Sequence, residues 1–114
     1  MSNTFMAFYE DAARTEVAAR AEGFTGDGSL MDYVEPHNYC TAKVFPTLAA
    51  AEEWLKGEIA ARKTVFGAGT IRARETVERR CRYCVCSGVR TLHEYIVDDT
   101  GIIEDAEIDS DCCD

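Results

Sequence analysis

The chain has 114 residues, of which 46% are hydrophobic and 29% are charged, and its formal net charge is −9. The length is that of one domain, residues 1–114, and it is sufficient for a buried core. The acidity excludes unspecific adhesion to nucleic acid or anionic membranes, because both are themselves negatively charged. No apolar run reaches the ~20 residues of a membrane span, and the first residues do not resemble a signal peptide, so we expect a cytoplasmic protein.

The first element predicted along the chain is a helix over residues 4–22. This stretch is rich in alanine, a strong helix former, and it begins at a threonine that can cap a helix. Gly23 suits the position after the helix end, and Phe24 supplies the apolar contact that often follows such a glycine. The helix would place Glu10 on its exposed face.

The middle of the chain predicts a loop, a strand and a second helix. Glycine and proline punctuate residues 25–38, so we expect a loop there, followed by a strand over residues 39–45. Thr47 can cap a helix over residues 47–64. One face of that helix carries an apolar stripe at helical spacing, formed by Leu48, Ala51, Leu55 and Ile59.

The last third predicts strands. Apolar and polar residues alternate over residues 70–78, and a further strand is expected over residues 89–97. The sequence Asp-Asp-Thr-Gly that ends at Gly101 is a turn signal, so residues 102–108 should return as the second strand of a hairpin. The acidic tail, residues 109–114, is expected to be frayed.

This order of elements predicts an α+β fold. Consecutive strands at the end of the chain favour an antiparallel sheet of three to five strands, with the two helices packed on one face. We find no internal repeat and no sign of a second domain.

The six cysteines are the most distinctive chemical feature. In a cytoplasmic chain they should be reduced, metal-bound or buried rather than paired in structural disulfides. Cys81 and Cys84 have the spacing of a zinc knuckle, in which a tight turn directs two thiolates at one ion. Tetrahedral zinc needs two more ligands, and His37 with Cys40 offers a pair at the same spacing. Zinc is therefore a candidate cofactor.

Other interpretations of these cysteines remain open. Cys112 and Cys113 could supply the second pair of zinc ligands if the tail folds back. The thiols could instead be small buried hydrophobic groups on a strand. A redox function or a nucleophilic pair between His93 and Cys84 or Cys86 is a further possibility, since neighbouring arginines could lower the thiol pKa values. The alternative for His93 is a sheet-surface histidine beside an acid.

Charge is unevenly distributed along the chain. Residues 1–55 hold nine acids and three bases, residues 56–90 hold three acids and nine bases, and residues 91–114 hold nine acids and no lysine or arginine. Acidic and basic strands could simply pair within the sheet. Alternatively, the segregation could create a bipolar surface with one pole facing a partner. The basic stretch, with Tyr83 within it, could contact single-stranded nucleic acid, but the overall acidity argues against direct nucleic-acid binding.

In size, acidity and architecture the chain resembles small acidic accessory proteins of bacteriophages, of the anti-CRISPR type. The resemblance rests on the strand Thr41–Phe45, the helix Thr47–Lys63 and the acidic hairpin Glu94–Glu107, and no residue roles carry over from it. It implies a non-enzymatic protein in the cytoplasm of a bacterial host, which inhibits a nucleic-acid-handling complex by occupying its basic surface. Clustered carboxylates would then imitate phosphates. The candidate partner-binding residues are Glu94, Asp98, Asp99, Glu104, Asp105 and Glu107.

Overall fold

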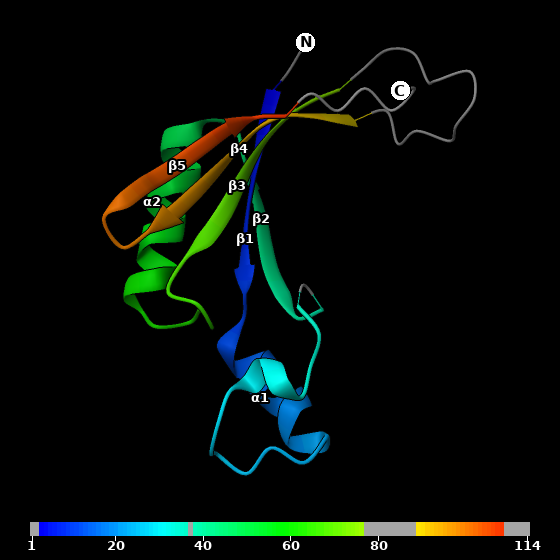
Figure 1. Cartoon of the computed structure of the whole chain (residues 1–114). Coiled ribbons are helices and arrows are strands. Elements are labelled where there is room, and N and C mark those ends of the chain that lie inside the picture. Colours follow the sequence, from blue (N-terminus) through cyan, green and yellow to red (C-terminus); the bar gives the residue numbers. More distant parts are fainter. Residues whose placement is uncertain (1–2, 37, 77–88, 109–114) are drawn as a thin grey trace, which may run out of the picture.

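Five antiparallel strands form one sheet in the order β2-β1-β3-β4-β5 (Figure 1). The computed structural model describes residues 3–36, 38–76 and 89–108. In chain order the elements are β1 (Asn3–Glu10), α1 (Ala12–Ala21), the 3-10 helix η1 (Leu30–Asp32), β2 (Cys40–Phe45), α2 (Leu48–Ala60), β3 (Gly69–Thr76), β4 (Val89–Asp98) and β5 (Gly101–Glu107). The predicted α+β fold with an antiparallel sheet is confirmed.

The prediction for the N-terminal helix is wrong over its first turns. Residues 3–10 form β1, which pairs with β2 on one side and with β3 on the other. Successive side chains of this segment point to opposite faces of the sheet, and Phe5, Ala7 and Tyr9 are directed to the core. Glu10, predicted on an exposed helix face, ends the strand and is only 7% exposed. Hydrogen bonding on both sides of a central strand outweighs the weak helix propensity of these few residues.

Helix α1 begins at a carboxylate cap rather than at a threonine. Asp11 Oδ1 accepts a hydrogen bond from the Arg14 backbone N–H at 3.0 Å, and Asp11 Oδ2 accepts one from the Thr41 hydroxyl at 2.8 Å. The helix end follows the sequence prediction. Gly23 has a φ of 112°, and the Phe24 backbone N–H donates to the Ala19 carbonyl at 3.0 Å, which closes the helix with a left-handed residue.

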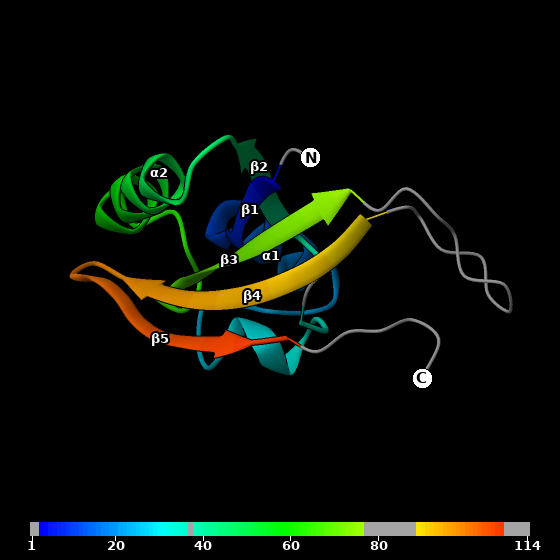
Figure 2. The ribbon, with the colours of Figure 1, turned by 90° about the horizontal axis from the view of Figure 1, so that it is seen from above.

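Helix α2 covers one face of the sheet and forms the core together with the strands beneath it (Figure 2). Thr47 caps it as predicted, since its hydroxyl accepts a hydrogen bond from the Ala50 backbone N–H at 3.2 Å. The predicted stripe is buried: Ala51, Leu55 and Ile59 pack against Ala7, Tyr9, Ile71 and Val97. Helix α1 lies beyond the end of β1, beside η1, and not over the centre of the sheet (Figure 1).

The other sheet face, called here the open face, is not covered by either helix in the described part of the chain. It is formed by the side chains that alternate with the core residues, among them Met6 and Phe8 of β1, Arg72 of β3, and Glu94 and Ile96 of β4. In the described residues, no helix has the length and apolar character needed to cross a membrane.

The C-terminal hairpin forms as predicted. Gly101 has a φ of 123°, and both the backbone N–H and the hydroxyl of Thr100 donate to Asp98 Oδ1, at 2.8 and 2.6 Å. The turn therefore needs a glycine at its end and a side-chain acceptor at its start. The tail over residues 109–114, predicted to be frayed, and the last two residues of the strand predicted over 70–78 lie outside the described residues.

Candidate functional site

The six acidic candidates all lie on the β4–β5 hairpin, but they do not share one face. Cross-strand partners point to the same side of a sheet. Glu104 is opposite Ile96, so it belongs with Glu94 to the open face. Asp105 is opposite Tyr95, a residue packed against the core, and therefore lies on the α2 side. Glu107 lies on the α2 side as well, whereas Asp98 and Asp99 form the turn.

Part of this acidity is neutralised inside the chain. Arg72 Nε lies 3.0 Å from Glu94 Oε2, and the two residues are cross-strand partners in β3 and β4. The Arg72 guanidinium also lies over the Phe8 ring, at 4.9 Å from its centroid. This pair matches the interpretation that acidic and basic strands pair within the sheet.

The remaining hairpin acids differ in their partners. Asp105 Oδ1 lies 3.5 Å from His93 Nε2, an ion pair only when the histidine is protonated. Hydrogen bonds from the Thr100 hydroxyl and backbone N–H lower the pKa of Asp98 below its usual value, so this carboxyl is ionised at neutral pH. Within the described residues Asp99, Glu104 and Glu107 form no ion pair, and all three are exposed. These are the acids most available to a partner.

Strand β5 forms one edge of the sheet. A shallow hollow of about 440 Å³ lies on the hairpin, lined by Glu94, Ile96, Glu104, Asp105 and Ala106. The hollow combines three carboxylates with two apolar side chains. Its open shape and its position beside a sheet edge suit a surface for a macromolecule better than a site that encloses a small substrate.

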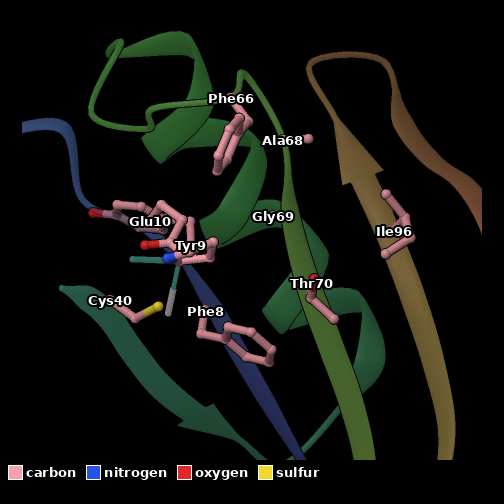
Figure 3. Close-up of a pocket in the computed structure, with 10 residues that line it drawn as sticks. Phe8, Tyr9, Glu10, Cys40, Phe66, Ala68, Gly69, Thr70 and Ile96 are labelled. Carbon is pink, nitrogen blue, oxygen red and sulfur yellow. The ribbon is translucent and has the colours of Figure 1, made fainter. Parts of the chain in front are cut away.

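A second hollow, called here the Glu10 cavity, opens on the open face where β1 ends and β3 begins. Its volume is about 320 Å³ (Figure 3). The lining residues are Phe8, Tyr9, Glu10, Pro36, Cys40, Phe66, Ala68, Gly69, Thr70 and Ile96. Phe66 and Phe8 lie at opposite ends of the cavity, with Cys40 and Glu10 on the β1–β2 side and Thr70 and Ile96 on the β3–β4 side (Figure 3).

Backbone hydrogen bonds fix the wall of this cavity that comes from the loop after α2. The Val65 backbone N–H donates to the Glu10 carbonyl at 2.9 Å, which ties the loop to the end of β1. The Gly67 backbone N–H donates to the Thr64 hydroxyl at 2.9 Å, and the φ of Gly67 is 68°. The resulting turn places Phe66 beside the cavity, with 60% of its surface exposed.

Glu10 and Cys40 are cross-strand partners at the inner wall. Burial raises the pKa of the Cys40 thiol, and the negative charge and hydrogen bonding of Glu10 raise it further against a smaller opposing effect of Arg14. The Cys40 thiol is therefore protonated at neutral pH. The Arg14 guanidinium, which is exposed, donates to the Cys40 carbonyl at 2.8 Å.

The role of Glu10 was missed because the sequence prediction placed it on a helix. Phe5–Tyr9 is a continuous run of apolar residues, which is consistent with a strand covered on both faces, and this signal could have placed the next residue, Glu10, at the end of a strand instead of on a helix. A carboxylate that ends a run of aromatic residues would then have been a candidate for a buried charge.

The proposed zinc ligands fall largely outside the part of the chain that the structure describes. Cys40 is described, as a free cysteine, whereas His37, Cys81 and Cys84 are not, and neither are Cys86, Cys112 and Cys113. The zinc site and the redox alternative therefore remain predictions. His93 is a partly exposed sheet residue whose ring stacks on Tyr95 at 4.6 Å between centroids.

Comparison of the chain with protein-family models, curated proteins and solved structures found no match.

Proposed function

We propose that this protein is a non-enzymatic interaction protein that binds a basic protein surface through its β4–β5 hairpin. The observation that carries the proposal is that the lysine-free and arginine-free hairpin carries only acidic charges. Residues 91–108 contain six carboxylates and no lysine or arginine. Three of the six, Asp99, Glu104 and Glu107, are exposed and have no ion-pair partner within the described residues. Such a surface attracts and orients a basic partner.

The geometry suits competition with nucleic acid. The acids lie on both faces and at the turn of the hairpin, which is hydrogen-bonded to β3 through β4. Negative charges held around a sheet edge can occupy a groove that binds a phosphate backbone. In keeping with the resemblance to bacteriophage accessory proteins, we propose a partner of the CRISPR effector type, inhibited by loss of its guide or target.

The test is displacement of a fluorescent target DNA from purified bacterial CRISPR effector complexes, followed by anisotropy. A hairpin variant carries lysine at Asp99, Glu104 and Glu107. A matched control carries lysine at three other exposed acids, Glu22, Asp27 and Glu53, and has the same net charge.

We expect the wild type and the control to displace DNA, and the hairpin variant to require at least about tenfold more protein, because steering and contact charges act locally. Binding should also weaken as salt is raised from 50 to 200 mM, since exposed charges are screened. Equal loss in both variants would show that only net charge matters. Failure of the wild type to displace DNA from any of the complexes would refute the inhibitor role.

A further inference from the structure

We infer that the outer edge of β5 accepts an extended basic segment of the partner as an additional, antiparallel strand of the sheet. The inference rests on the proposed function, which supplies the partner's charge, and it adds the mode of binding. In the described part of the chain, β5 pairs with β4 on one side and with no strand on the other (Figure 2). Residues 103–107 of this strand are all exposed. Addition of a strand to such an edge is a common mode of peptide recognition.

The hydrogen-bonding pattern shows which backbone groups of this edge are available. The Ile108 backbone N–H donates to the Leu92 carbonyl at 2.9 Å, so these two residues form a hydrogen-bonded pair. Hydrogen-bonded and non-hydrogen-bonded pairs alternate in an antiparallel ladder, and the register is regular over residues 104–107. The backbone N–H and C=O groups of Asp105 and Glu107 therefore point away from β4, where an incoming strand can bond to them.

The side chains of the same two residues set the charge of the incoming strand. Residues directly opposite each other in an antiparallel pair have neighbouring side chains on one face. Glu107 forms no ion pair within the described residues, and Asp105 has only His93, which is charged only when protonated. Lysine or arginine at two alternate positions of the segment would lie opposite these carboxylates, and the residue between them would face Ala106. The edge therefore favours a basic-x-basic pattern.

These carboxylates also disfavour pairing of the edge with a second copy of the chain. Two β5 strands that paired through their outward groups would place Asp105 or Glu107 of one copy opposite an acid of the other. Like charges directly opposite each other destabilise a strand pair. A basic segment relieves this repulsion, so the charge that protects the edge from self-association selects its partner.

The other edge of the sheet, β2, is unsuited to a basic segment. The Asp11 backbone N–H donates to the Tyr39 carbonyl, so the next carbonyl, that of Cys40, points away from β1. The Arg14 guanidinium donates to this outward carbonyl at 2.8 Å. Lys43 is exposed further along β2, and lysines commonly protect sheet edges from pairing. Charge complementarity therefore favours β5 over β2.

The experiment compares two isomeric peptides in which lysine alternates with threonine. Both have capped ends and the same number of N-methyl groups, which lie on lysine amides in one isomer and on threonine amides in the other. With lysines opposite Asp105 and Glu107, the lysine amides face β5 and the threonine amides face solvent. We expect the threonine-methylated isomer to bind the full chain at least about tenfold more tightly in an NMR titration, because the other isomer loses its hydrogen bonds to the edge. Binding should also slow hydrogen exchange at the amides of Asp105 and Glu107.

Glu107→Pro and Glu107→Gln form a matched pair of variants. Both remove one carboxylate, but only proline also removes the outward N–H, and an edge position whose N–H faces solvent tolerates proline. Glu107→Pro should bind the threonine-methylated peptide at least about threefold more weakly than Glu107→Gln. Equal binding by these two variants would overturn the inference.

The peptides test the inference independently of any variant. It is also overturned if the isomers bind the wild type equally, if the lysine-methylated isomer binds more tightly, or if neither binds. The DNA displacement assay decides the proposed function separately. A chain that displaces DNA but binds the two isomers equally would keep the proposed function without strand addition.

Discussion

Replacing Gly69 by alanine tests how closely α2 is packed against the sheet. Gly69 is buried at the start of β3 and has no left-handed φ, so its missing side chain is what matters. A Cβ atom there would lie 2.6 Å from Leu55 Cδ1 and 2.9 Å from the Phe8 carbonyl oxygen. Leu55 is fully buried, and Phe8 lies in a strand paired on both sides, so neither can move away freely.

The cost of this substitution follows from these two contacts. Extra methyl groups in a packed core typically cost about 1–3 kcal/mol, and we expect the upper half of that range because one contact is with backbone. Alanine also reduces the entropy of the unfolded chain, and this effect offsets about 0.4–1 kcal/mol of the packing cost. The net loss should be about 2 kcal/mol in the free energy of unfolding, or roughly 8 °C in Tm for a domain of this size.

Urea unfolding followed by circular dichroism measures this loss, with Gly57→Ala as the matched control. Gly57 lies within α2, and no atom lies within 4 Å of a Cβ added there. Alanine should stabilise that position by about 0.5–1 kcal/mol, because it is a better helix former. A Gly69→Ala protein as stable as the wild type, or a loss of the same size at Gly57, would refute the packing argument.

Three further experiments test single contacts. Burial raises the pKa of Asp11, but hydrogen bonds from the Arg14 backbone and a β2 hydroxyl outweigh it and hold the pKa below 3.8. This carboxylate therefore stabilises the fold above that pH, and the stabilisation is lost as the pH falls through the folded-state pKa. Asp11→Asn should be less stable than the wild type at pH 5 and should match it in strong acid. Parallel pH profiles of the two proteins would contradict this. Thr15 is fully buried, and its hydroxyl has no hydrogen-bond partner within the described residues. Thr15→Val should raise the free energy of unfolding by about 1 kcal/mol in urea titrations, and a loss would show that the hydroxyl is satisfied. A double-mutant cycle on Arg72 and Glu94, with glutamine at each, should give a coupling of about 0.5–1 kcal/mol that shrinks in high salt; zero coupling at low salt would mean that the pair is not formed in solution.

Helix α2 and the hairpin were predictable because their signals are local. The cap at Thr47, the apolar stripe that follows it and the glycine at Gly101 act within a few residues of one another. Strand β1 was not predictable in this way. Its stability comes from Phe45 and Ala73, the residues paired with Phe5 on either side, which lie far away in the sequence. Short-range propensity carries no information about such pairing.

The faces of the hairpin acids also depended on one irregularity. A regular ladder from the turn would place Asp105 opposite Glu94, with two like charges in direct contact. The register shifts between Ile96 and Val97, so Asp105 lies opposite Tyr95 and Glu104 lies opposite Ile96. A bulge of this kind reverses which acids share the open face. The sequence predicted the acidic hairpin but could not predict this shift.

The contacts within the open face decide which acids of the hairpin are available to a basic partner. Exposed acids such as Glu104 and Glu107 attract any polycation, and salt weakens that attraction. Arg72 forms an ion pair with Glu94 and lies over the Phe8 ring, so the centre of the open face has little affinity for a further cation. A basic partner should therefore bind the hairpin quickly, and its binding should weaken as salt is raised.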